Sequence, residues 1–81
     1  MLPNEREVWR DGRVGVVVAR KWYGYGVAVW DGPQIGLEIP TTRKGLDRAV
    51  DRAITRAERM VARYQNLDEE SQRLYHRFVG H

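Results

Sequence analysis

The chain has 81 residues, of which 42% are hydrophobic and 31% charged, and its formal net charge is +3. This length suffices for one hydrophobic core, so we expect a single domain over residues 1–81. Cysteine is absent, which excludes disulfides, thiolate metal sites and cysteine nucleophiles. The N-terminus has no signal-peptide pattern and no apolar run is long enough to span a membrane, so a cytoplasmic location is the default expectation.

The first part of the chain predicts two tight reversals between strands. Asp11-Gly12 is a two-residue hairpin signal between residues 6–10 and 13–21, whose side chains alternate or are β-branched. The glycines of residues 22–26 permit a second reversal before a third strand at 27–30. We therefore expect consecutive antiparallel strands.

A fourth strand is predicted next. Asp31-Gly32-Pro33 is typical of a turn, and residues 35–39 alternate as a strand does, with Pro40 expected to end it. The sequence therefore predicts a four-stranded antiparallel β-meander over residues 6–39, with a three-stranded sheet as the alternative.

Residues 43–64 predict a long amphipathic helix, with Thr41 or Thr42 as its N-cap. Asn66 begins a second capping pattern, which predicts a separate short helix over residues 67–79. The expected fold class is α+β, with the meander packed on the long helix. At about 100° per residue, the apolar residues of the long helix fall in one sector, which contains Leu46, Ala49, Val50, Ala53, Ile54, Ala57, Met60, Val61 and Tyr64.

The charged residues of this helix fall in two further sectors. The acidic one contains Asp47, Asp51 and Glu58. The basic one, here called the arginine ridge, contains Arg48, Arg52, Arg56, Arg59 and Arg63. Like charges four residues apart cost a few tenths of a kcal/mol per pair, so a helix built for stability alone would interleave acids and bases. An anionic partner would offset this cost.

A second basic surface is predicted on the face of the sheet opposite the helix, here called the open face. If both hairpins have two-residue turns, Trp9, Trp22 and the valines at 14, 16, 18, 27 and 29 face the helix, and Ile35, Leu37 and Ile39 are expected to join this buried face. The open face then carries Arg6, Val8, Arg10, Arg13 and Lys21 around Trp30. A three-residue turn at 23–25 would instead move Trp30 inward.

No residue pattern indicates an enzyme. The two histidines, His76 and His81, cannot form a metal site alone, and Ser71 is the only serine. A glycine-rich phosphate loop is also absent. The sequence therefore predicts a non-enzymatic protein without catalytic residues, metal or cofactor.

The element order resembles that of plant-type AP2 domains and of the arm-binding domains of tyrosine integrases. In both families a three- or four-stranded antiparallel sheet precedes a packing helix, and the uncovered sheet face enters the DNA major groove. The resemblance covers roughly residues 6–64 and rests on element order, so it implies a function but assigns no residue.

We therefore expect a small basic regulator that binds nucleic acid, DNA rather than RNA. Its predicted contacts are the arginine ridge with Arg6, Arg10, Arg13, Lys21 and Trp30 of the open face. The alternative is a protein–protein interaction module that docks on an acidic partner, such as a phage-encoded protein that targets its host. A homodimer is a further option. The abundance of Arg, Val, Ala and Gly is typical of an actinobacterium or its phage.

Overall fold

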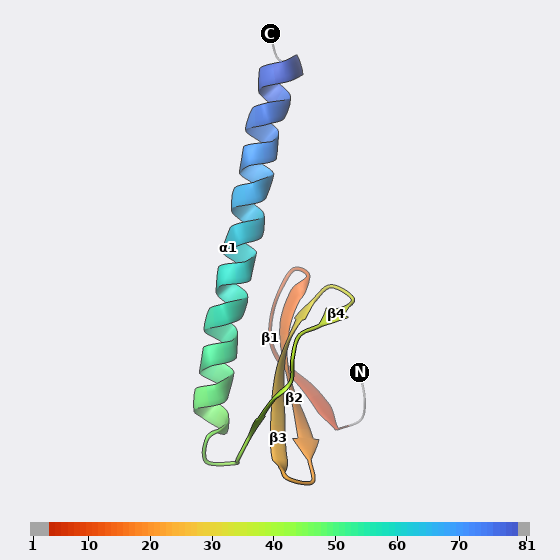
Figure 1. Ribbon diagram of the computed structural model, residues 1–81, viewed down its shortest axis with the longest axis vertical. Helices are drawn as coiled ribbons and strands as arrows, with labels where there is room; N and C mark the ends of the chain where they lie inside the picture. The colour runs from red at the N-terminus through yellow and green to blue at the C-terminus, as the bar shows by residue number, and fades with distance from the viewer. Residues whose placement is uncertain (1–3, 80–81) are drawn as a thin grey trace.

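The computed structural model describes residues 4–79, with side chains described over residues 4–67. The chain forms two layers, an antiparallel sheet and one helix that crosses one of its faces (Figure 1). The α+β class and the antiparallel meander are confirmed. The elements are β1 (Glu5–Asp11), β2 (Val14–Lys21), β3 (Gly24–Asp31), β4 (Gln34–Ile35), β5 (Ile39–Thr41) and α1 (Leu46–Val79).

Both hairpins have two-residue turns. Asp11 pairs with Val14 at the first turn, and Lys21 pairs with Gly24 at the second. Gly12 has a φ of 61° and Gly24 a φ of 135°, backbone conformations that side chains with a Cβ rarely adopt. The predicted reversals therefore form where glycine permits them.

The hairpin register places the valines on the face that α1 covers. Val16 pairs with Val29 and Val18 pairs with Val27, while Val14 and Val16 are completely buried beside Ala57 of α1. This part of the predicted core is confirmed. The placement of Trp22 in it is wrong, because Trp22 belongs to the second turn and is 96% exposed. The placement of Ile35, Leu37 and Ile39 in it is also wrong, because all three are exposed and none packs in the core cluster.

A β-bulge in β1 changes which side chains reach each face. Glu7 pairs with Val17 but Trp9 pairs with Val16, so Val8 is an extra residue in the strand. Because side chains alternate, this extra residue shifts the preceding part of β1 by one position. Arg6 consequently lies opposite Val18 on the helix side of the sheet, and its predicted place on the open face is wrong.

The predicted fourth strand is split in two. β4 and β5 both pair with β3 and are separated by residues 36–38. Pro40 does not end the strand but lies within β5, opposite Gly26. An edge strand tolerates proline because one side of its backbone needs no partner. The Gly36 N–H donates to the Val29 carbonyl at 2.8 Å and holds the interruption against β3.

The helix begins after a hydrogen-bonded turn. Thr42, one of the two predicted caps, accepts the Gly45 N–H with its hydroxyl oxygen at 3.2 Å, and α1 starts at Leu46. The helix side chains that pack on the sheet core end at Tyr64, and α1 extends beyond the sheet to Val79 (Figure 1). A separate helix over residues 67–79 is not seen, since α1 continues through the stretch. The side chains of residues 68–79 lie outside the described part.

Candidate nucleic-acid interface

The arginine ridge lies along the exposed part of α1. All five of its arginines are exposed, and none forms an ion pair among the side chains described over residues 4–67. From Arg48 to Arg63 the ridge rises about 22 Å at 1.5 Å per residue. Unpaired guanidinium groups keep their hydrogen-bond donors available for phosphate or carboxylate oxygens. The ridge is therefore a continuous cationic surface.

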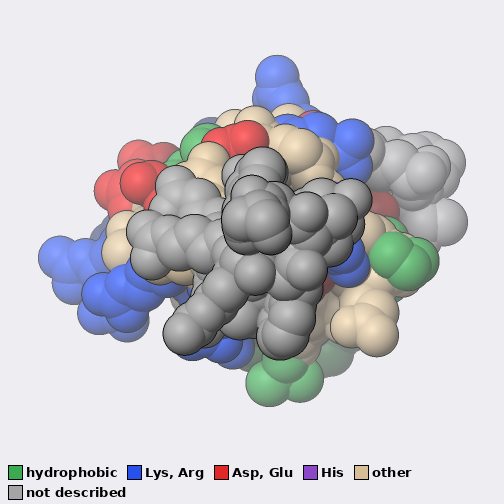
Figure 2. All heavy atoms as spheres, turned by 90° about the horizontal axis from the view of Figure 1, so that it is seen from above, with side chains coloured by type: hydrophobic (Ala, Val, Ile, Leu, Met, Phe, Trp, Pro, Cys, Tyr) green, Lys and Arg blue, Asp and Glu red, His purple; other side chains and the backbone are tan. Residues whose placement is uncertain are grey.

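The acidic residues of α1 do not neutralise this surface. Asp47, Asp51 and Glu58 are exposed and form no ion pair with the ridge within residues 4–67. Figure 2 shows Lys and Arg (blue) in a group apart from Asp and Glu (red) on the side where α1 lies in Figure 1. Segregation of the two signs leaves a field of one sign over the ridge.

The open face of the sheet carries cations that already have local partners. Arg10 lies 3.2 Å from a carboxylate oxygen of Glu7, and Lys21 lies 3.5 Å from one of Glu38. Glu38 also accepts a hydrogen bond from the Tyr23 hydroxyl at 2.8 Å, which raises the pKa of that tyrosine. The open face is thus mixed in charge, whereas the sequence predicted a basic surface.

Arg13, predicted on the open face, binds residues that join the sheet to α1. Its Nε lies 2.6 Å from an Asp31 oxygen, and its guanidinium carbon lies 5.1 Å from the centre of the Tyr64 ring. The Tyr64 hydroxyl donates to the other Asp31 oxygen. This hydrogen bond, followed by the Arg13 contacts, lowers the pKa of Asp31, and it raises the pKa of Tyr64. Arg13 therefore belongs to a structural cluster.

Trp30 lies on the open face, because the second turn has two residues. It pairs with Gly15, while Ala28 and Val17 pair beside it, and its side chain is half-buried. Part of the Trp30 side chain therefore remains accessible. Among the predicted open-face residues, the structure brings Arg10, Lys21 and Trp30 onto that face and places Arg6 and Arg13 elsewhere.

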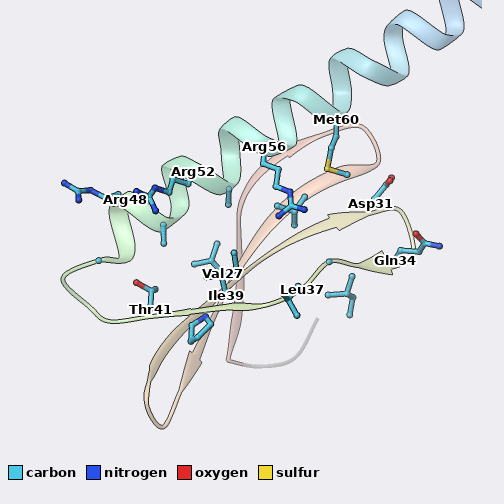
Figure 3. A pocket seen from close by; sticks show the side chains of 17 residues that line it. Val27, Asp31, Gln34, Leu37, Ile39, Thr41, Arg48, Arg52, Arg56 and Met60 are labelled. Carbon is cyan, nitrogen blue, oxygen red and sulfur yellow. The ribbon is translucent and has the colours of Figure 1, made fainter.

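Sequence reasoning missed a groove of about 600 Å³ between α1 and the β4–β5 edge (Figure 3). Its lining is mostly apolar, but Arg48, Arg52 and Arg56 contribute from the ridge. A signal was present in the sequence, since Ile35, Leu37 and Ile39 add apolar surface to an edge strand that a single helix does not reach.

Two further features were sought among the described residues, a cluster of metal ligands and a membrane-spanning helix. No group of three or more His, Cys, Asp or Glu that could hold a metal ion occurs among the described residues. Nor does α1, over the same residues, combine the length and apolar character that a membrane crossing requires.

Comparison with known proteins adds no family. No protein-family model matches the chain, and neither a curated protein nor a solved structure matches it significantly.

Proposed function

We propose that this chain is a non-enzymatic regulator that binds duplex nucleic acid through the arginine ridge of α1. The observation that carries the proposal is the row of five exposed arginines without an ion-pair partner among the described side chains. On the open face, by contrast, Arg10 and Lys21 each have an acid within 4 Å. A cation that is already paired contributes less to a new electrostatic contact, because binding must first break or share its existing pair.

The dimensions of the ridge suit a phosphate backbone. The ridge rises about 22 Å, and one DNA strand carries a phosphate about every 3.4 Å along the duplex axis, so the ridge is long enough to meet several phosphates. Each guanidinium can donate two parallel hydrogen bonds to one phosphate. Such contacts provide affinity and orientation without reading base sequence. DNA is the first ligand to test, since the element order resembles that of two DNA-binding families.

Salt dependence of binding tests this proposal. Replacing Arg52, Arg56 and Arg59 with Gln removes up to three phosphate contacts, so the slope of log K against log salt should become shallower by about 2.7. The measurement is fluorescence anisotropy with a labelled duplex at several salt concentrations. A thermal melt of the triple variant should match wild type, because the three side chains are exposed and unpaired.

A matched control removes the same charge from the sheet. The control replaces Arg6, Arg10 and Lys21 with Gln. These three cations lie in β1 and β2, and the control has the same net charge as the ridge variant. We expect its salt slope to change by less than about one phosphate contact. The proposal fails if wild type shows no binding to duplex DNA or RNA at low salt, or if the sheet variant loses as much slope as the ridge variant.

A further inference from the structure

The helix layer over the sheet is incomplete. α1 packs on β2 and β3, and its apolar residues meet the valines of these strands. Strands lie about 4.8 Å apart, whereas packed helices need 8–10 Å between axes, so one helix covers roughly two strands. The β4–β5 edge of the same sheet is left beside α1 without a second helix over it within the described residues (Figure 1).

The groove beside α1 has an apolar floor. Val27, Val29, Ala49 and Ala53 line it between the sheet and the helix, with Met60 at one end. The edge segment forms the outer wall with its own apolar residues, of which Leu37 is 87%, Ile35 60% and Ile39 51% exposed. Three exposed aliphatic residues in five positions form a contiguous apolar strip of the kind that marks a docking surface.

The inner wall of the groove is cationic. Arg48, Arg52 and Arg56 line it at a spacing of four residues, or about 6 Å along α1. Figure 3 shows Arg56 reaching from α1 over the groove, with Arg52 one turn away. The acid in the lining is Asp31, which is already bonded to Arg13 and Tyr64. An occupant with carboxylates along one flank and apolar side chains beneath them would complement this groove.

We propose that the groove binds an amphipathic helix of a partner protein, which has apolar residues on one face and carboxylates spaced i, i+4 along one flank. Lying beside α1, such a helix would complete the helix layer over β3 and the edge strands. Its carboxylates would recur at the same rise of about 6 Å as the three arginines. This interaction shares three arginines with the proposed nucleic-acid contact but also needs the apolar strip, which phosphate contacts do not use, so the two can be tested apart.

The test uses two designed peptides of about 14 residues, long enough to span the groove. Both have Leu at i, i+3, i+4 and i+7 positions. One has Glu along the flank and the other has Lys at the same places. Isothermal titration calorimetry with the full chain should show the Glu peptide binding at least about tenfold more tightly than the Lys peptide. Binding of neither peptide, or equal binding of both, would overturn the proposal.

Variants of the chain locate the site. The Arg52→Glu, Arg56→Glu double variant should reverse the preference between the two peptides. The control Arg6→Glu, Arg20→Glu carries the same charge change on exposed residues that do not line the groove, and it should keep the original preference. If both double variants behave alike, the peptides respond to overall charge and the groove is not their site.

Leu37→Ser separates this proposal from the proposed function. Leu37 is almost fully exposed, so the variant should fold, lose at least about tenfold in Glu-peptide affinity and keep wild-type DNA affinity. Unchanged peptide affinity would contradict a docking role for the apolar strip. Evidence for another occupant would also overturn the proposal. Displacement of the Glu peptide by laurate would indicate a fatty-acid site. A dimer that is seen by sedimentation and dissociated by Leu37→Ser would indicate that a second copy of the chain fills the groove.

Discussion

The two faces of the sheet bury small apolar residues by different means. On the helix side, α1 covers Val14 and Val16. On the open face no helix or strand is present within the described residues, yet Val17 is only 8% exposed. Long side chains lie over the backbone there. If Gly15 carried a Cβ, that atom would lie 3.7 Å from the Arg10 Nε, and a Cβ on Gly26 would collide with the Glu38 side chain.

This difference decides where free positive charge can be found. Cations on the open face lie beside acids. Arg10 pairs with Glu7 of the same strand, and Lys21 pairs with Glu38, which lies between β4 and β5. The arginines of α1 are exposed and lie outside the core cluster, and no acid among the side chains described over residues 4–67 pairs with them. Net charge therefore does not identify a binding surface until the local partners of each cation are known.

The largest contrast between the faces should come from placing one carboxylate on each. Val16→Asp buries a charge beneath α1 and should abolish cooperative unfolding, because an isolated buried carboxylate costs more than a small domain's stability reserve. Val17→Asp, one residue later, should fold with a reduced melting temperature, since the side chains over it can move aside. Circular dichroism melts of the two variants make the comparison. A folded Val16→Asp would contradict the observed register.

An intermediate effect is expected from the Asp31 cluster on the helix side. The pKa of Asp31 is lowered in the folded state, so its contribution to stability is present above the unfolded pKa of about 3.9 and is lost as pH falls through the folded pKa. Asp31→Asn should therefore weaken the decline in stability of the chain below about pH 4. Urea unfolding at several pH values measures this. Parallel curves for wild type and variant would show that the cluster does not contribute.

The smallest effect on DNA binding is expected at Trp30. If the ridge alone holds the ligand, Trp30→Ala leaves both affinity and salt slope unchanged, because the tryptophan lies on the open face away from the arginines. A loss of about 1–3 kcal/mol with an unchanged slope would instead show that a base stacks there and that the open face takes part. A melt of the variant must accompany the measurement to exclude unfolding.

The main features of the fold could be predicted because they follow from periodicity and turn chemistry. The valine alternation with two-residue turns fixes the register of the central hairpin. The apolar sector of α1 likewise identifies its core face. The helix beyond Asn66 was divided wrongly, since a capping pattern is a weak local preference that a continuing helix overrides.

The composition of the open face could not be predicted, because a single bulge determines it. If β1 had no bulge at Val8, the side chains of Arg6 and Arg10 would both lie on the open face. With the bulge, Glu5 and Glu7 lie on the open face together with Arg10. No turn or glycine signal accompanies this bulge in the sequence. The groove was missed for a related reason, since the position of α1 across the strands is a packing outcome that helical periodicity does not specify.

The most direct test of the central claim is a ¹H–¹⁵N correlation titration of the full chain with a short mixed-sequence DNA duplex. Once assigned, the backbone amide signals and the arginine side-chain Nε signals show for each residue whether it lies at the binding site, so α1 and the sheet can be compared. The account predicts that the largest shifts fall between Arg48 and Arg63 and decrease as salt is added. Shifts confined to β1, β2 and β3 would place binding on the open face, and the absence of shifts at low salt would contradict nucleic-acid binding altogether.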